Sequence, residues 1–268
     1  GDGSYDYRNR IPNNTNFVPS WYSKNSSSLS SSYVSDDFYA MMDNGEGLML
    51  PSDRMDLAVG RILANDLNQA KVLVDKIETY YRADAYGDWR NRILLISDDV
   101  DLNWEGSLQQ NIDNIATTLE TERPFFNSVK VLADSYQQET TSGGERYPDA
   151  NAAIRDVIDL GALVVNYYGH GGEDGLTAER IFDRNDAQNV NNLCKYNCFI
   201  TVTCEFTKFD DPQRQTAGEF TYWNKNGGSI AMFTTTRQIF ANIASNFNIT
   251  LNKYLYAFNQ NEYPTIGE

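Results

Sequence analysis

Short apolar runs alternate with longer segments of helical spacing along most of this chain. The runs are rich in β-branched and aromatic residues and are bounded by glycine or polar loops, which is the pattern of strands buried on two faces. The predicted strands cover residues 56–63, 93–96, 129–132, 163–168, 199–203 and 229–234. The predicted helices cover residues 67–81, 108–119, 149–159, 217–225 and 240–258. This alternation predicts an α/β fold with a parallel sheet between two helical layers.

The first third of the chain differs from the rest in pattern. A turn-rich start at residues 1–6 and a serine-rich loop at residues 23–35 come before any strong periodicity. The predicted strand at 56–63 and the helix after it then indicate an N-terminal α/β sub-domain over residues 1–84, with a further strand expected upstream. The remaining strands and helices predict a second, catalytic sub-domain over residues 85–268.

Composition and charge exclude several classes of function. The 268 residues are 41% hydrophobic, which is enough for a full core, and they carry a formal charge of −15. Nucleic-acid binding needs clustered lysine and arginine, so this acidic chain is not expected to bind it. The sequence contains no apolar run long enough for a transmembrane helix. The acidic charge is more typical of an exposed, secreted type of surface. Because the chain opens on Gly1 and not on methionine, we expect a mature or excised piece.

Two of the predicted strands lead into reactive residues, one into His170 and the other into Cys204. In an open α/β sheet, ligands bind beyond the carboxyl ends of parallel strands, so these strands would place a base beside a nucleophile. His170 is the only histidine and stands among Gly169, Gly171 and Gly172, which indicates a sharp turn or a close approach. The alternative is that both are ordinary core residues, since single cysteines and histidines often are. The strand-end positions favour a cysteine-nucleophile active site.

The backbone next to these two residues could complete such a site. The N–H groups of Gly171 and Cys204 are candidates for an oxyanion hole, because donors placed where negative charge develops stabilise the transition state. Glu205 is another carboxylate near the nucleophile, but as the next residue on a strand it points to the opposite face, so we expect a supporting role for it and count it among the substrate-binding candidates. Thr236 and Arg237, at the polar end of the strand over 229–234, are further substrate-binding candidates.

The other two cysteines, Cys194 and Cys198, lie four positions apart across a turn-like stretch. A disulfide between them could form, but two unbridged structural thiols are the favoured interpretation. A zinc site would need more cysteine or histidine ligands than the chain offers.

An acid-rich turn begins at Asp36 and Asp37 and could bind calcium. Its spacing departs from the EF-hand pattern, so the sequence leaves metal binding open, with a structural calcium ion as one option. No cofactor is expected to be required.

The amino-acid sequence at the two strand ends resembles that of a known family. N-Y-Y-G-H-G-G, with T-C-E-F placing Cys204 34 positions after His170, resembles the gingipain family of cysteine peptidases. C-E-F-T-K-F-D-D-P, A-G-E-F and G-G-S-I-A-M-F-T-T-T-R are similar to the signal peptidases and sortases of type IX secretion within that family. The resemblance implies a caspase-like α/β/α sandwich with a mostly parallel sheet.

The resemblance also implies an activity and partners. Such an enzyme removes the C-terminal signal domain of type IX cargo proteins and passes the acyl-enzyme to water or to an amine of anionic lipopolysaccharide. It would act at the cell surface, associated with the outer membrane and with other secretion-system proteins. The alternatives are an ordinary secreted gingipain-like protease and, from another class, a non-catalytic binding module of the secretion machinery.

Two further site assignments come from the resemblance. The acid that orients His170 is expected at the end of the I-S-D-D strand, at Asp98 or Asp99. An acidic residue with which arginine-specific gingipains grip a basic side chain aligns near Leu108, where this chain is apolar. Strict specificity for arginine or lysine is therefore not expected, because an unpaired buried guanidinium is costly.

Overall fold

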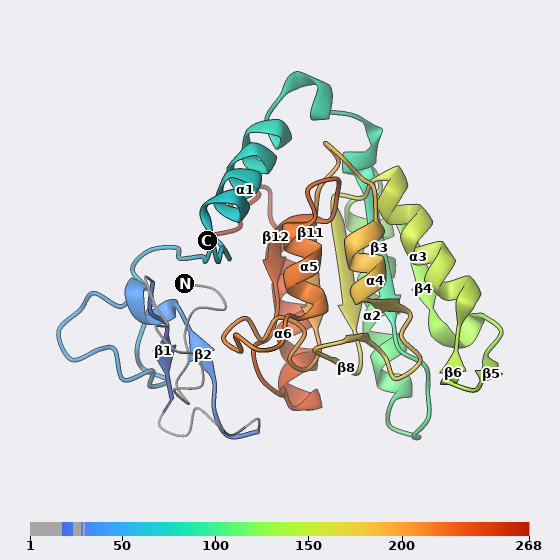
Figure 1. Cartoon of the computed structure of the whole chain (residues 1–268), viewed down its shortest axis with the longest axis horizontal. Coiled ribbons are helices and arrows are strands. Elements are labelled where there is room, and N and C mark those ends of the chain that lie inside the picture. The colour runs from blue at the N-terminus through green and yellow to red at the C-terminus, as the bar shows by residue number, and fades with distance from the viewer. Residues whose placement is uncertain (1–17, 24–27, 29, 268) are drawn as a thin grey trace.

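A five-stranded parallel sheet lies at the centre of the molecule (Figure 1). The computed structural model describes residues 18–23, 28 and 30–267. The sheet has the order β12-β11-β7-β3-β4, and every neighbouring pair in it is parallel. Its strands are β3 (Arg92–Ser97), β4 (Asn127–Leu132), β7 (Val164–Tyr168), β11 (Asn197–Val202) and β12 (Ser229–Phe233).

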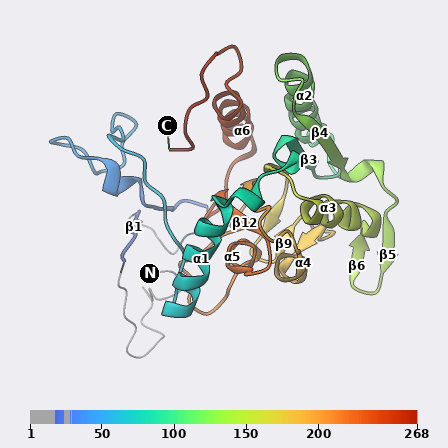
Figure 2. The ribbon, with the colours of Figure 1, turned by 90° about the horizontal axis from the view of Figure 1, so that it is seen from above.

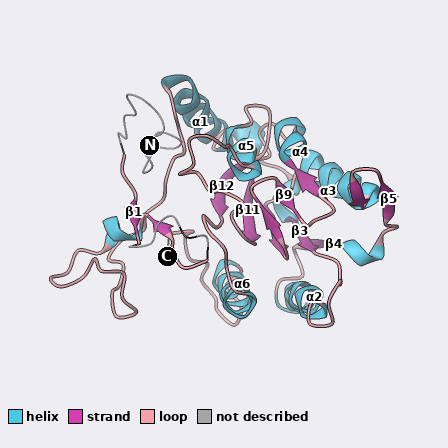
Figure 3. Ribbon diagram, turned by 60° about the horizontal axis from the view of Figure 1, so that its bottom comes forward, coloured by secondary structure: helices cyan, strands magenta, loops and turns pink. Residues whose placement is uncertain are grey.

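Helices cover both faces of this sheet, as Figure 3 shows. The helices are α1 (Leu67–Tyr80), α2 (Gly106–Glu122), α3 (Pro148–Leu160), α4 (Arg184–Asn189), α5 (Ala217–Trp223) and α6 (Ala241–Leu255). The helices α2 and α6 bury their apolar faces in one core, and α3, α4 and α5 bury theirs in the other. In β3, Leu94 faces one core and Leu95 the other, as the period of two in a strand requires. The α/β/α sandwich expected from the sequence is confirmed.

The ends of several helices follow from local sequence. Asp66 caps α1 by accepting a hydrogen bond from the Gln69 N–H at 2.8 Å. Thr216 and Glu219 form a capping box at the start of α5. Gly161 ends α3 with φ at 96°, a conformation that favours glycine.

Shorter elements connect or flank the main ones. The strands are β1 (Trp21–Tyr22), β2 (Val34–Ser35), β5 (Glu139–Thr141), β6 (Gly144–Arg146), β8 (Gly171–Gly172), β9 (Gly175–Leu176) and β10 (Phe182–Asp183). The 3-10 turns are η1 (Asp37–Ala40), η2 (Ala83–Ala85), η3 (Asp88–Asn91) and η4 (Ala133–Ser135). None of the helices in this described part of the chain has the length and apolar character needed to span a bilayer.

The strand predicted over residues 56–63 is wrong: the segment bends at residues 56–57 and is not paired as a strand. Its alternating apolar residues do not mark a buried face, since Leu57 and Ile62 are 44% and 54% exposed. The segment is held through side chains instead. Arg61 makes two hydrogen bonds of 2.6 Å to Asp36, and Trp223 donates to the Leu63 carbonyl at 2.9 Å. The turn-rich start at 1–6 and part of the serine-rich stretch, residues 24–27 and 29, lie outside the described residues.

Four buried asparagines connect the sheet to the helices α2 and α6. Asn166 of β7 and Asn248 and Asn252 of α6 are fully buried, and Asn111 of α2 is 4% exposed. Asn166 donates to Asn248 at 3.0 Å and accepts from Asn252 at 3.0 Å, while Asn248 donates to Asn111 at 2.9 Å. Buried amides are stable only when paired in this way, so the network fixes how α6 lies against α2 and β7.

Helix α1 packs beside α5 and the edge strand β12 (Figure 2), and Lys76 anchors it there. The Lys76 side chain is 2% exposed. Its ammonium group donates to the carbonyls of Tyr222 at 2.8 Å and Gly227 at 3.0 Å, and it lies 4.9 Å from the Tyr196 ring centroid. Burial lowers the pKa of Lys76 to about 7.

Replacing Lys76 with methionine should remove a pH dependence of stability. Between the native pKa of about 7 and the ordinary value of 10.5, the unfolded chain holds a proton that the native amine has lost. The free energy of unfolding of the native protein should therefore rise from pH 7 to pH 10, and Lys76→Met should flatten this rise. Urea unfolding at each pH measures the effect, with Lys71→Met on the exposed side of α1 as control. Parallel profiles for the native and Lys76→Met proteins would contradict the assignment.

Candidate active site

His170 stands just beyond the carboxyl end of β7, and its backbone is held on both sides. The Asp98 carboxylate accepts a hydrogen bond from the His170 N–H at 2.6 Å. The His170 carbonyl accepts from the Thr177 N–H at 3.0 Å and also from the Tyr167 hydroxyl. The imidazole itself remains accessible, with 55% of its side chain exposed. The backbone is thus fixed while the ring is open to a substrate.

The glycines around His170 permit two close approaches that a side chain would block. A Cβ on Gly169 would lie 2.6 Å from the Cβ of Asp98, and one on Gly171 would lie 2.7 Å from the Thr203 hydroxyl oxygen. The second contact brings the histidine loop directly against Thr203, the residue before Cys204. The glycines therefore allow the loop that carries His170 to pack against the segment that carries Cys204.

Glu105, immediately before α2, holds the imidazole ring. One carboxylate oxygen lies 2.9 Å from His170 Nε2, and the other accepts the Leu102 N–H at 2.6 Å. The glutamate is 3% exposed. Burial alone would raise its pKa, but the hydrogen bonds from Leu102 and His170 outweigh this and hold the pKa of Glu105 below its usual value. The Trp104 ring meets the imidazole edge to face, at 5.7 Å between centroids and 80° between planes.

Cys204 follows β11, the neighbour of β7 in the sheet. It is half-buried, and its sulfur lies 3.9 Å from the Ile239 carbonyl oxygen. Glu205 adopts a left-handed conformation with φ at 51°, which is costly for a residue with a side chain. The Glu205 N–H donates to the Arg237 carbonyl at 3.2 Å and so holds this turn against the chain that follows β12.

His170 and Cys204 line one pocket of about 270 Å³ at the carboxyl ends of β7 and β11. The remaining lining residues come from the start of α2, the start of α6 and the strand ends: Trp104, Leu108, Tyr168, Gly169, Val202, Thr203, Ile239, Phe240, Ala241 and Ala244. No carboxylate is among the described residues that line it. The pocket is therefore apolar apart from the imidazole, the thiol and the Thr203 and Tyr168 hydroxyls.

The acid that contacts the imidazole, Glu105, is not one that the sequence indicates. The resemblance implies that Asp98 or Asp99 orients the ring. In the structure Asp98 bonds the His170 backbone, while Asp99 accepts from the Tyr147 hydroxyl at 3.1 Å. Glu105 reaches the ring instead, because the loop after β3 turns back toward it. The only sequence signal for this is a glutamate three positions before the helix predicted over residues 108–119.

The expected substrate-binding residues divide into two groups. Leu108 lines the pocket, whereas Glu205, Thr236 and Arg237 are not among its lining residues. Arg237 forms a buried ion pair with Asp210, with two hydrogen bonds of 2.8 Å. Glu205 lies 3.7 Å from the Lys208 ammonium group. Their positions suit them to holding the loops around Cys204.

The remaining candidates concern thiols and metal. Cys194 and Cys198 are both unbridged, as the favoured interpretation held, and burial raises the pKa of the Cys198 thiol to about 12. Asp36 of the acid-rich turn is engaged by Arg61. A different acidic group, at Asp98 and Asp99, has the spacing of metal ligands.

Comparison with known structures defines the fold as that of gingipain-type cysteine peptidases. The chain superposes on the Arg-specific cysteine proteinase gingipain R with a TM-score of 0.69, at 18% identity, over 88% of this chain and 51% of that one. A complex of Porphyromonas gingivalis RgpB pro- and mature domains gives a TM-score of 0.63 at 17% identity, over 79% of this chain and 47% of that one. This chain thus spans about half the length of these relatives.

The chain belongs to peptidase family C25, whose family model matches residues 1–268. This is a family of cysteine peptidases. No curated protein is significantly similar in sequence to the chain.

Proposed function

We propose that this chain is a cysteine endopeptidase in which His170 and Cys204 form the catalytic dyad. The observation that carries the proposal is the shared pocket: two residues from neighbouring strands line it, and a buried glutamate holds the imidazole. The contact between Gly171 and Thr203 further supports it, since it joins the two loops.

The contact with Glu105 determines which imidazole nitrogen does the chemistry. An ionised carboxylate can only accept, so Nε2 carries the proton of the neutral ring and Nδ1 presents its lone pair. Nδ1 of His170 then takes the proton of the Cys204 thiol, and Glu105 stabilises the imidazolium that results. With Glu105 bound to Nε2, His170 alone can serve as the base, and the mechanism needs no second base in the pocket.

The thiolate of Cys204 then attacks the scissile carbonyl. A carbon–sulfur bond forms, and the oxyanion is held by the N–H groups of Gly171 and Cys204, at about 3 kcal/mol for each donor. His170 gives its proton to the leaving amine as the carbon–nitrogen bond breaks, which leaves a thioester. Water or an incoming amine attacks this acyl-enzyme, loses a proton to His170 and releases the thiol.

We infer that the finer activity is that of PorU, the signal peptidase and sortase of type IX secretion. The sequence motifs around Cys204 and within residues 217–237 support this inference. Its substrates would be cargo proteins with a C-terminal signal domain, and an amine of anionic lipopolysaccharide would compete with water for the acyl-enzyme. The protein would then work at the cell surface in association with the outer membrane and other secretion-system proteins.

An experiment can distinguish the proposed function from two alternatives. An ordinary gingipain-like protease would cleave cargo without preference for the signal-domain junction. A non-catalytic module would leave Cys204 unreactive. Labelling with an iodoacetamide probe, followed by mass spectrometry, should modify Cys204, and a peptide ending at a cargo cleavage site should protect it. Absence of labelling would exclude the enzyme, and protection by unrelated peptides would favour the ordinary protease.

Cleavage should depend little on a basic residue before the scissile bond. Leu108 forms part of the pocket wall, and no ion pair with the substrate is lost when arginine is replaced. The values of kcat/KM for two peptides that differ only by arginine and alanine at this position should agree within about tenfold, or 1.4 kcal/mol. Leu108→Asp is the matched variant and should create a preference for arginine. A preference above about a hundredfold in the unmodified protein would point to a carboxylate elsewhere in the pocket.

A further inference from the structure

Apolar side chains form the buried part of the catalytic pocket. Leu108 of α2, Val202 at the end of β11 and Ala244 of α6 are each 2% exposed. Tyr168, at the end of β7, contributes its ring, and its hydroxyl is already paired because it donates to the Ala241 carbonyl at 3.0 Å. A substrate side chain that enters the pocket therefore meets mainly carbon atoms.

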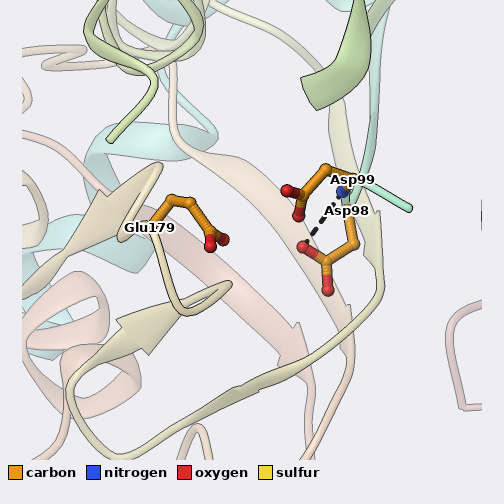
Figure 4. Close-up of side chains that lie close together, drawn as sticks. All are labelled: Asp98, Asp99 and Glu179. Carbon is orange, nitrogen blue, oxygen red and sulfur yellow. Dashed lines mark hydrogen bonds between the residues drawn. The ribbon is translucent and has the colours of Figure 1, made fainter. Parts of the chain in front are cut away.

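Within the part of the chain that the structure describes, the carboxylates near His170 lie outside this pocket. Asp98, Asp99 and Glu179 lie together (Figure 4) and line a separate cavity. Glu105 lines that cavity too, and the imidazole contacts it at 2.9 Å. A lysine or arginine side chain in the catalytic pocket would thus be buried without a partner, and an aspartate or glutamate would lie beside the thiolate. Both arrangements are costly.

The volume of the pocket suits a single side chain. Its cavity measures about 270 Å³, slightly less than the roughly 300–1,000 Å³ of pockets that hold whole small-molecule ligands. Ala241 and Ala244 leave space on the side of α6, while Trp104 and Phe240 are 45% and 63% exposed and form the rim. A medium-sized apolar side chain can be buried here, whereas glycine or alanine would leave the cavity partly empty.

The pocket adjoins the thiol, so it faces the part of the substrate that is acylated. Cys204 lines the pocket, and its sulfur lies 3.9 Å from the carbonyl oxygen of Ile239, another lining residue. In the acyl-enzyme, the residue before the scissile bond is joined to this sulfur through its carbonyl carbon. Its side chain is therefore the nearest to the pocket, since the residue after the scissile bond leaves with the amine that His170 protonates.

We propose that the pocket selects substrates with a medium-sized aliphatic or thioether side chain, such as that of leucine or methionine, immediately before the scissile bond. The inference rests on the proposed peptidase function and adds its substrate class. Leu108, Ala241 and Ala244 determine the specificity, because they set the depth and the width of the cavity. The attraction comes from burial of apolar surface, for which a difference of one methylene changes the rate by about 10- to 200-fold.

A set of matched peptides tests the selectivity directly. Quenched fluorescent peptides of the form Ala-Ala-Xaa-Ala-Ala carry leucine, methionine, glycine, arginine or aspartate as Xaa. We expect kcat/KM for the leucine and methionine peptides to exceed that for the other three by at least about tenfold. Mass spectrometry of the products should place the cut after Xaa. Equal rates, faster cleavage of the glycine or arginine peptide, or a cut before Xaa would overturn the proposal.

A binding measurement separates the pocket from the peptidase reaction. Fluorescein-labelled product peptides ending in leucine should bind the Cys204→Ala protein at least about tenfold more tightly than those ending in glycine or arginine, as fluorescence polarisation measures. Selective binding without cleavage by the native protein would refute the peptidase function and support the pocket assignment. Cleavage that is indifferent to Xaa, with equally indifferent binding, would leave the peptidase function standing and overturn the pocket assignment. Absence of binding by any of the peptides would also overturn it.

Substitutions in the pocket wall locate the selectivity. Ala241→Leu changes an exposed position in the first turn of α6, so the variant is expected to fold, which circular dichroism checks. It should fill the cavity and lower the ratio of kcat/KM for leucine over alanine at Xaa by at least about tenfold. Leu108→Ala enlarges the cavity instead and should shift the preference toward phenylalanine. Thr250→Leu, exposed on α6 and absent from the pocket lining, is the control. An unchanged ratio in folded Ala241→Leu would overturn the proposal.

Discussion

Replacing Cys204 with alanine is expected to abolish peptidase activity, with a loss in kcat/KM of at least about 10⁴-fold. The thioester cannot form without the sulfur, and no other thiol lines the pocket among the described residues. His170→Ala should cost a similar factor, because the thiol then lacks its base. Since the two groups act as a unit, the double variant should be little worse than either single one. Cleavage of a peptide spanning a cargo junction measures all three.

Cys194→Ala is the matched control for the thiol, because Cys194 is also half-buried and unbridged. It should keep full activity. Both active-site variants should keep the native fold, since the imidazole is largely exposed and the thiol lies at a strand end. Activity above about one tenth of the native value in Cys204→Ala or His170→Ala, with the fold intact, would eliminate the dyad.

Glu105→Gln is expected to lower kcat/KM by roughly 10²- to 10⁴-fold while leaving KM nearly unchanged. The neutral amide can donate to Nε2 and so favour the ring tautomer that carries its proton on Nδ1, where it cannot accept the thiol proton. It also removes the charge that stabilises the imidazolium. Glu105 acts through His170 and is thus a positioning residue.

A merely structural role for Glu105 would affect stability but not the protonation of the thiol. The rate of iodoacetamide alkylation of Cys204 as a function of pH separates the two roles. In Glu105→Gln the rise in rate should move to higher pH, because the thiolate–imidazolium pair loses a stabilising charge. Glu122→Gln, at the far end of α2, supplies a control on the same helix. An unshifted pH profile together with undiminished kcat would assign the acid's role to another group.

Much of the fold could be predicted from the sequence because its signals are local. Each of the five sheet strands contains a short, mostly apolar run, and the helices carry clear periodicity and caps such as Asp66. The placement of His170 and Cys204 at one edge followed from topology, since parallel strands present their carboxyl ends together. The segment over 56–63 misled because its alternation resembles a strand, while side-chain anchors at Arg61 determine its path.

The acid could not be predicted because its position depends on a loop. Asp98 and Asp99 follow the strand β3, where active-site groups are expected, but Asp98 bonds the His170 backbone and Asp99 bonds the Tyr147 hydroxyl. Glu105 reaches the ring only because the chain folds back after β3 and bonds its Leu102 N–H to the same carboxylate. Such a return is set by tertiary contacts that no spacing rule describes.

The buried asparagines also fix the position of the helix that forms one wall of the catalytic pocket. Ala241 and Ala244 form one wall of that pocket and stand on the same helix as Asn248 and Asn252. A slip of α6 along its axis by one residue rise, about 1.5 Å, would stretch the hydrogen bonds that join its amides to Asn111 and Asn166, whereas an apolar seam would tolerate it. Leucine or methionine in place of these amides could preserve stability, yet α6 could then adopt several positions along its axis, and the pocket wall would shift with it. The buried hydrogen bonds between β7, α2 and α6 therefore determine the shape of the catalytic pocket at the surface.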